Sequence, residues 1–249
     1  MITDPWFYAV ALPAVLLLGI SKSGFGAGFG ALGVPLMALA VPVPQAAAIL
    51  LPVLLAMDAL GVAALVRDAD RALLRQLVPA GLLGTVIGTL LFGVLSATAV
   101  AGVVGALALA FAAIRVLQPP RPDAAPPPRW LGTVLATVSG FTSFVAHAGG
   151  PPIGFYVLPL RLQPIVFTAT MAVFFAVVNL SKWVPYAWLG LLDLRNLLTS
   201  LVLLPLVPVG VWAGVRLARR ISRERFERVI VVGMTVTGVK LLWDSLRAL

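Results

Sequence analysis

The chain has 249 residues, of which 61% are apolar and only 11% are charged. A soluble domain is typically about one-quarter charged and about half apolar, so this composition excludes a soluble enzyme. Because a membrane-spanning helix needs about 20 residues, the chain is filled by membrane helices and has no room for a second, water-soluble domain. We therefore expect an all-α, polytopic membrane protein.

The charge balance is basic, with 18 Lys and Arg residues against 9 Asp and Glu residues and a net charge of +9. In a soluble protein this excess indicates nucleic acid, but in a membrane protein basic loops hold the cytoplasmic side in place. We expect membrane lipid, and no nucleic acid, as the partner of these loops. The sequence contains no Cys, which excludes disulfides and thiolate metal sites.

Apolar runs separated by charges, Pro pairs or Gly clusters predict ten helical segments. They cover residues 6–21, 25–40, 45–66, 76–95, 98–117, 130–146, 151–160, 163–186, 196–216 and 228–246. Segments 25–40 and 151–160 are short or rich in Gly and Pro, so each is a full span, a broken helix or a re-entrant hairpin. The first run lacks a basic leader and a cleavage pattern, so we expect a retained span and not a signal peptide.

The Pro-rich stretch 118–129 divides the chain into near-equal halves and is expected to be an extended cytoplasmic linker. We predict a first transmembrane repeat at 1–117 and a second at 130–249. The halves share Gly and Pro positions: Gly24-Phe25 matches Gly140-Phe141, Gly33 and Pro35 match Gly149 and Pro151, and Pro79, Gly84 and Gly88 match Pro205, Gly210 and Gly214. This pattern indicates a duplicated unit.

The distribution of basic residues predicts the orientation. If every segment reverses the chain and the N-terminus is outside, 14 of the 18 basic residues lie inside and 4 outside. The inner set is Lys22, Arg67, Arg71, Arg75, Arg115, Arg121, Arg129, Arg161, Arg216, Arg219, Arg220, Arg223, Arg225 and Arg228, and the outer set is Lys182, Arg195, Lys240 and Arg247. This bias favours both termini outside. Loop 67–75 is then inside while its counterpart 187–195 is outside, so the repeats are inverted, as in secondary transporters with broken helices at the midplane.

The first interruption runs from residue 21 to 35 and contains glycines at 24, 26, 28, 30 and 33. Two interpretations stand side by side. Exposed backbone N–H groups at a helix start bind an anion, or the small residues let helices pack closely, as GxxxG patterns do. The substrate-binding candidates in this interruption are Ser23, Gly24, Gly26, Gly28 and Gly30.

The second interruption runs from residue 140 to 152 and ends in Gly-Gly-Pro-Pro, which cannot continue a helix. Beside it lies the single histidine, His147. We interpret His147 as a substrate-contacting or proton-titrating group, because ionisable groups inside a membrane are costly and usually functional. The alternative is a structural His bonded to a freed carbonyl. The substrate-binding candidates here are Thr142, Ser143, His147, Gly149 and Gly150.

Three further polar residues lie in predicted spans. Asp58 and Asn179 occupy matching positions in the two halves, and Lys182 lies one turn after Asn179. Asp58 is either a proton relay or a partner in a helix–helix hydrogen bond. Lys182 either counters an anionic substrate or snorkels to the outer interface. We add Asn179 and Lys182 to the substrate-binding candidates, and we take Asp58 and His147 as candidates for proton coupling.

Catalytic patterns are absent from the sequence, which has no HExxH, GxSxG or Walker A motif and no paired carboxylates within one span. An enzyme in the membrane needs at least a nucleophile–base or acid pair. We therefore expect neither an enzyme nor a bound metal or cofactor.

At its two interruptions the sequence resembles the TauE/SafE family of sulfite and organosulfonate exporters. The residues that carry the resemblance are Ser23 to Pro35, His147-Ala148-Gly149-Gly150-Pro151-Pro152, Phe167 to Thr170, Phe174-Phe175, Asn179, Lys182 and Pro185-Tyr186. The resemblance covers essentially the whole chain. It implies a transporter of small, mostly sulfur-containing anions in the bacterial inner membrane.

The leading hypothesis is a secondary transporter, and more specifically an exporter, of a small anion such as sulfite or an organosulfonate. Because the sequence has no nucleotide motif, an ion gradient drives it, with H⁺ as the expected coupling ion. The alternative is a non-transporting membrane scaffold or assembly subunit. That alternative predicts glycines packed helix against helix and no polar cavity between the halves.

Overall fold

The computed structural model describes residues 1–25, 30–117, 126–218, 220 and 223–248. All regular structure in these residues is helical, which confirms the all-α prediction. The α-helices are α1 (Pro5–Ile20), α2 (Gly33–Met37), α3 (Val43–Leu65), α4 (Arg71–Phe92), α5 (Ala97–Leu117), α6 (Arg129–Ala146), α7 (Gly150–Val157), α8 (Pro164–Ser181), α9 (Trp183–Trp188), α10 (Leu194–Leu203), α11 (Leu206–Ala218) and α12 (Arg223–Arg247). Short turns extend or connect them at η1 (Ser21–Phe25), η2 (Gly30–Leu32), η3 (Val66–Asp68) and η4 (Leu158–Leu160).

Within the described residues, six helical segments are long and apolar enough to cross a membrane: Pro5–Ser23, Val43–Asp68, Arg71–Phe92, Ala97–Leu117, Pro164–Trp188 and Arg228–Arg247. A bent pair, α10 with α11, adds a seventh. The chain is therefore a multi-pass membrane protein. Helices α2 and α7 have only five and eight residues, far below the length of a span. The short segments predicted at 25–40 and 151–160 are thus not full spans.

The segment predicted at 196–216 is not one straight helix. It bends by 42° between α10 and α11. The break contains Pro205, which lacks an N–H donor and clashes with the preceding helical turn. By contrast, Pro13, Pro52 and Pro79 lie inside helices that continue past them. A proline alone therefore did not reveal where this chain breaks.

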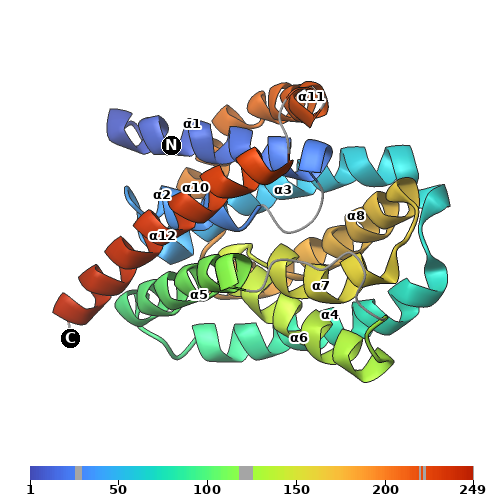
Figure 1. The fold of residues 1–249 in the computed structure, drawn as a ribbon. Coiled ribbons are helices and arrows are strands. Elements are labelled where there is room, and N and C mark those ends of the chain that lie inside the picture. Colours follow the sequence, from blue (N-terminus) through green and yellow to red (C-terminus); the bar gives the residue numbers. More distant parts are fainter. Residues whose placement is uncertain (26–29, 118–125, 219, 221–222, 249) are drawn as a thin grey trace.

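The helices form pairs that join the two halves of the chain. Helix α1 packs on α11, α4 on α6, α5 on α12, and α3 on α8 (Figure 1). Every one of these pairs links a helix before residue 118 with one after it. The N-terminal half of α3 is almost wholly buried, so this helix lies in the centre of the bundle.

Glycines allow the closest of these pairs to form. A Cβ atom added at Gly84 of α4 would lie 1.9 Å from the carbonyl oxygen of Thr137 on α6. A Cβ added at Gly19 of α1 would lie 2.9 Å from the backbone of Gly210 on α11. Association of helices in a membrane depends on such close van der Waals packing. The small residues of these helices therefore serve close packing.

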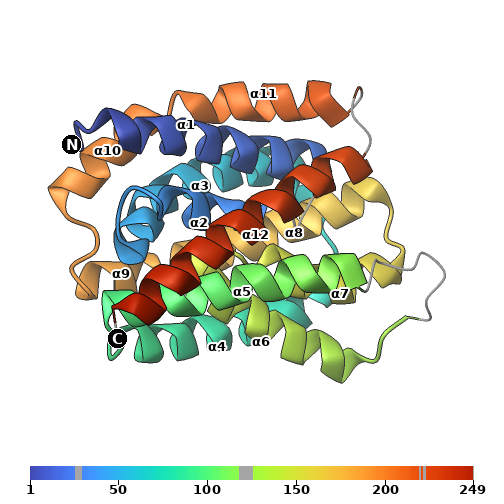
Figure 2. The ribbon, with the colours of Figure 1, turned by 60° about the vertical axis from the view of Figure 1, so that its left-hand side comes forward.

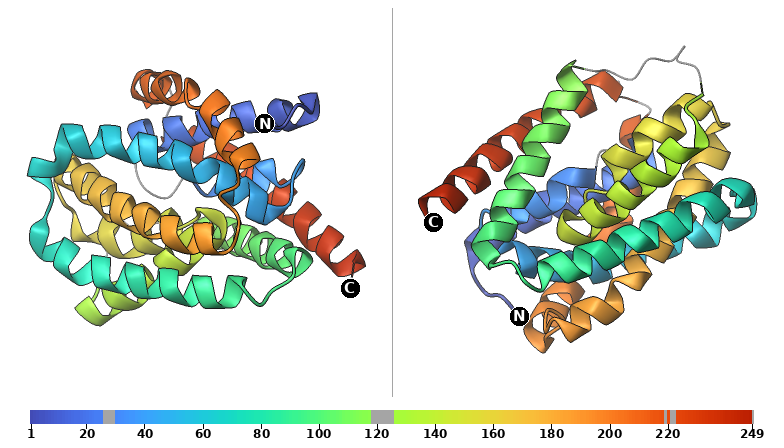
Figure 3. Two further views of the ribbon diagram at one scale, coloured as in Figure 1. Left: turned by 180° about the vertical axis from the view of Figure 1, so that it is seen from behind. Right: turned by 90° about the horizontal axis from the view of Figure 1, so that it is seen from below.

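Both chain termini lie at one end of the bundle (Figure 2). The end of α5, the start of α6, the end of α11 and the start of α12 lie at the opposite end, which also carries the α3–α4 connection (Figures 2 and 3). We call this opposite end the basic end, because Arg67, Arg71 and Arg75 lie in or beside the α3–α4 connection and Arg216 and Arg220 lie beside the end of α11.

Candidate functional site

A cavity of about 350 Å³ lies among α1, η1, α3, α8, α11 and the break between α6 and α7. Its walls follow α3 from Leu54 to Leu65 and α8 from Thr168 to Asn179. Because α3 ends and α8 begins at the basic end, the cavity extends from the interior of the bundle toward that end.

The inner part of the cavity meets a group of polar side chains, which we call the polar cluster. Its members are Lys22 of η1, Asp58 of α3, Ser143 of α6, His147 at the end of α6, and Asn179 and Lys182 at the end of α8. All of these except Lys182 line the cavity. Tertiary packing thus gathers residues that lie far apart in the sequence.

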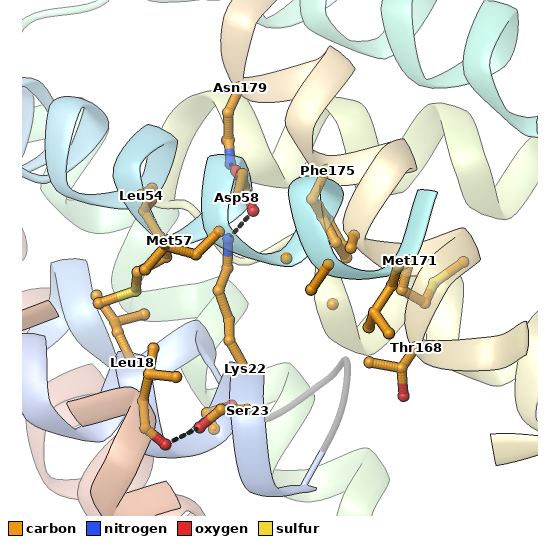
Figure 4. Close-up of a pocket in the computed structure, with 18 of the residues that line it drawn as sticks. Leu18, Lys22, Ser23, Leu54, Met57, Asp58, Thr168, Met171, Phe175 and Asn179 are labelled. Carbon is orange, nitrogen blue, oxygen red and sulfur yellow. Dashed lines mark hydrogen bonds and ion pairs between the residues drawn. The ribbon is translucent and has the colours of Figure 1, made fainter. Parts of the chain in front are cut away.

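Asp58 is the acceptor at the centre of the polar cluster and is only 4% exposed. The ammonium group of Lys22 pairs with its Oδ1, and the side-chain amide of Asn179 donates to its Oδ2 at 2.6 Å. Figure 4 shows Lys22 reaching up from its helix to Asp58, with Asn179 on the far side of the carboxylate. Since the Lys22 side chain is 26% exposed, the ion pair sits at the cavity wall.

Lys182 lies behind this pair and is completely buried. Its Nζ donates to the carbonyl oxygen of Ser143 at 2.6 Å, to Oδ1 of Asn179 at 2.7 Å and to the Ser143 hydroxyl at 2.8 Å. It also lies 3.0 Å from Nδ1 of His147. The prediction that Lys182 snorkels to the interface is therefore wrong, because acceptors inside the bundle satisfy its ammonium group.

His147 ends α6 in a left-handed backbone conformation with φ of 51°. Its Nε2 lies 2.8 Å from the carbonyl oxygen of Ala47. A carbonyl only accepts, so Nε2 carries the proton and donates, which leaves Nδ1 as the acceptor that faces Lys182. These partners define one neutral tautomer of His147. His147 therefore bonds a backbone carbonyl, as the structural interpretation proposed, and it also lines the cavity.

The hydrogen bonds also define the charge of the polar cluster. Lys182 faces three groups that only accept: the Ser143 carbonyl, Oδ1 of Asn179 and Nδ1 of His147. Three such acceptors match the three N–H donors of an ammonium group. The cluster as described then holds two cationic lysines and one carboxylate. One positive charge remains uncompensated in apolar surroundings, where an unpaired charge is costly.

Thr142 and Gly149 have a structural place in the break between α6 and α7. The Thr142 hydroxyl donates to the carbonyl of Ala148 at 3.1 Å, and the Ser139 hydroxyl donates to the carbonyl of Gly149 at 2.7 Å. A Cβ added at Gly149 would lie 2.7 Å from the Ser139 carbonyl oxygen. Thr142 and Gly149 therefore stabilise the break between α6 and α7, the first by a hydrogen bond and the second by close packing. The neighbouring Gly150 instead lines the cavity.

The candidates of the first interruption are only partly placed. Gly26 and Gly28 lie outside the described residues, Gly24 lies in η1, and Gly30 begins η2. Ser23 lines the cavity, with its hydroxyl 2.7 Å from the carbonyl of Gly19 and 3.0 Å from that of Val211.

Sequence reasoning missed the role of Lys22, which was counted only among the basic residues of the inner side. The structure places Lys22 on Asp58 at the cavity wall. The available signal was its position directly before the glycine run, comparable to that of His147 before the second break. The sequence analysis named Tyr186 only for the family resemblance; it is fully buried and its hydroxyl donates to the Phe144 carbonyl at 2.6 Å.

The helical bundle, with a buried polar cluster at a cavity, is that of a multi-pass membrane protein. The family model described as sulfite exporter TauE/SafE matches residues 11–241, and the chain belongs to this family. The resemblance seen in the sequence is thereby confirmed, and the family implies transport of sulfite- or sulfonate-type anions and no enzymatic activity. Comparisons with curated proteins and with solved structures gave no match.

Proposed function

We propose that this protein is a secondary transporter that binds a small anion at the polar cluster. The observation that carries the proposal is a cluster of two lysines and one carboxylate beside a cavity of about 350 Å³. Charges inside a membrane protein are costly and mark ion or substrate pathways. An excess of cationic side chains over carboxylates attracts an anion to the cavity wall.

Lys22 is the group that contacts the anion. It lines the cavity and is partly exposed, whereas Lys182 is completely buried behind it. With no substrate bound, Asp58 pairs with Lys22. An arriving anion competes with Asp58 for the ammonium group, and a proton then neutralises the displaced carboxylate. This exchange couples anion binding to proton uptake, with Asp58 as the proton carrier.

His147 positions the substrate site in this scheme. Both of its ring nitrogens are engaged, one by Ala47 and one by Lys182. The ring therefore holds Lys182 in place and forms part of the cavity wall. Because both ring nitrogens of His147 are engaged by other groups, we assign proton coupling to Asp58.

The direction of loading follows from the position of the cavity. Its walls lead toward the basic end of the bundle, and basic loops favour the cytoplasmic side. Access from the cytoplasm supports an exporter in a bacterial inner membrane, with both termini outside.

Inverted repeats are supported by matching contacts. Helix α1 packs on α11 as α6 packs on α4, and Gly19 and Gly140 both lie at these crossings. Asp58 and Asn179 follow them at the same separation along the chain and are hydrogen-bonded to each other. In this arrangement, the central helices α3 and α8 lie on the axis that relates the two halves of the chain. The scaffold alternative predicts closely packed glycines, which the helix pairs do contain, but it also predicts no polar cavity between the halves, and the contact of this cavity with the polar cluster argues against it.

The test is anion flux into and out of proteoliposomes containing purified protein. Lys22→Met is expected to abolish the anion flux that the wild-type protein shows, measured with sulfite and with organosulfonates in parallel. The matched control is Lys240→Met, which removes a lysine from the exposed ion pair with Asp244 on α12 and leaves flux unchanged. Normal flux in the Lys22→Met protein, or absence of flux for every anion with the wild-type protein, contradicts the proposal.

A further inference from the structure

We propose that the substrate is an organic anion with an apolar body, and not a bare inorganic oxyanion. Its acid group binds at Lys22, and its apolar body lies between α3 and α8. This inference rests on the proposed function and specifies the chemical class of the substrate.

The cavity has a polar end and an apolar wall. On α8, Met171 and Phe175 line it one helical turn apart, together with Ala172. Met57 and Leu60 line it on α3. Figure 4 shows Met171 and Phe175 on one side of the Lys22–Asp58 pair and Met57 on the other. Beyond the polar cluster, an occupant of this cavity therefore meets mainly hydrocarbon and thioether groups.

The size of the cavity supports the same conclusion. A cavity of about 350 Å³ falls in the size range of pockets for organic ligands, about 300–1,000 Å³. Sulfite, with one sulfur and three oxygens, fills only the part next to Lys22. An anion that carries several carbon atoms fills the apolar part as well.

The free energy of binding in this cavity favours an organic anion over a bare oxyanion. A bare oxyanion gains nothing from the methionine and phenylalanine side chains, and it loses water on reaching them. Each methylene group that a substrate buries against such a wall raises its affinity about fourfold. Lys22 makes the site prefer an anion to a neutral molecule of the same length, because only the anion pairs with its ammonium group.

The experiment measures the binding of a homologous series to purified protein by isothermal titration calorimetry. The probes are sulfite, methanesulfonate, propanesulfonate and hexanesulfonate, with hexanol as the neutral analogue. We expect affinity to rise with chain length, by at least about tenfold from methanesulfonate to hexanesulfonate, and hexanol not to bind. Sulfite or methanesulfonate binding as tightly as hexanesulfonate overturns the inference while leaving the proposed function intact. Binding of hexanol as tightly as hexanesulfonate overturns both.

A variant of the apolar wall provides the second measurement. Phe175→Ala is expected to lower the affinity ratio of hexanesulfonate to methanesulfonate about threefold or more, because the longer chain loses contact area. The control is Leu180→Ala on the same helix, since Leu180 is 64% exposed and lies outside the cavity lining. An unchanged ratio in the Phe175→Ala protein contradicts the assignment of the apolar body to this wall.

Discussion

Replacing Lys182 with Met tests whether this lysine holds the polar cluster together. Methionine keeps most of the apolar stem of the side chain and removes the ammonium group. The substitution leaves the carbonyl of Ser143, Oδ1 of Asn179 and Nδ1 of His147 without their donor. All three acceptors belong to residues that are at most 8% exposed, so bulk water does not replace the lysine.

The size of the effect follows from the hydrogen bonds that are lost. Side-chain hydrogen bonds between membrane helices contribute about 0.6 kcal/mol on average and at most about 1.7 kcal/mol each. Loss of three such bonds predicts that the free energy of unfolding falls by about 2–5 kcal/mol. That is a large share of the stability of a typical protein, about 5–15 kcal/mol.

The assay is unfolding by sodium dodecyl sulfate in mixed micelles, followed by tryptophan fluorescence. The control is Lys240→Met, whose exposed i,i+4 ion pair with Asp244 is worth less than about 1 kcal/mol. Lys182→Gln, which keeps two donors, is expected to recover part of the loss. If Lys182→Met unfolds at the same denaturant concentration as the control, Lys182 does not hold the cluster and the charge count above fails.

Three further substitutions separate the remaining roles. Asp58→Asn removes the competitor for Lys22, so calorimetry is expected to show anion affinity about two- to fivefold higher, because the ion pair of a partly exposed lysine is worth about 0.5–1 kcal/mol; flux should lose its dependence on external pH, and unchanged pH dependence excludes Asp58 as proton carrier. His147→Gly keeps the left-handed backbone turn, so the protein should elute as folded material on size exclusion while its flux falls, whereas normal flux makes His147 purely structural. Gly84→Ala would bring a Cβ within 1.9 Å of a carbonyl on α6 and should lower the free energy of unfolding by about 1–3 kcal/mol; Gly93→Ala, whose nearest neighbour lies at 3.6 Å, should not, and equal stability of the two variants refutes close packing there.

Much of the fold is predictable from local signals. Long apolar runs identify the helices, and Gly-Gly-Pro-Pro identifies the break after α6, because proline and glycine act on the backbone of their own neighbourhood. The bend at Pro205 was not predictable in this way, since Pro13, Pro52 and Pro79 occur in continuous helices. Whether a helix bends at a proline depends on how neighbouring helices satisfy the freed carbonyl, which is a tertiary property.

The residues of the candidate site also fall into two groups: those that local sequence signals reveal and those that only tertiary packing brings to the site. Asp58, Asn179 and His147 stand out in the sequence because each is a polar group in an apolar run. Lys22 stands at the end of such a run, where a basic residue usually marks the cytoplasmic surface. Its actual partner lies 36 residues away on α3, and only the tertiary packing of the bundle brings the two together.

The two lysines of the polar cluster differ in what their surroundings leave available, and this difference locates the substrate. The donors of Lys182 are fully used by the protein, and through Asn179 it supports Asp58 from behind. Lys22 approaches the same carboxylate from the cavity. One carboxylate thus serves two cations, and the cation it serves from the cavity side is the one an anion can reach. An anion at Lys22 takes the place of the Asp58 carboxylate, which a proton neutralises, and release of the anion and the proton returns Asp58 to Lys22, so the ion pair is the resting position to which the transport cycle comes back.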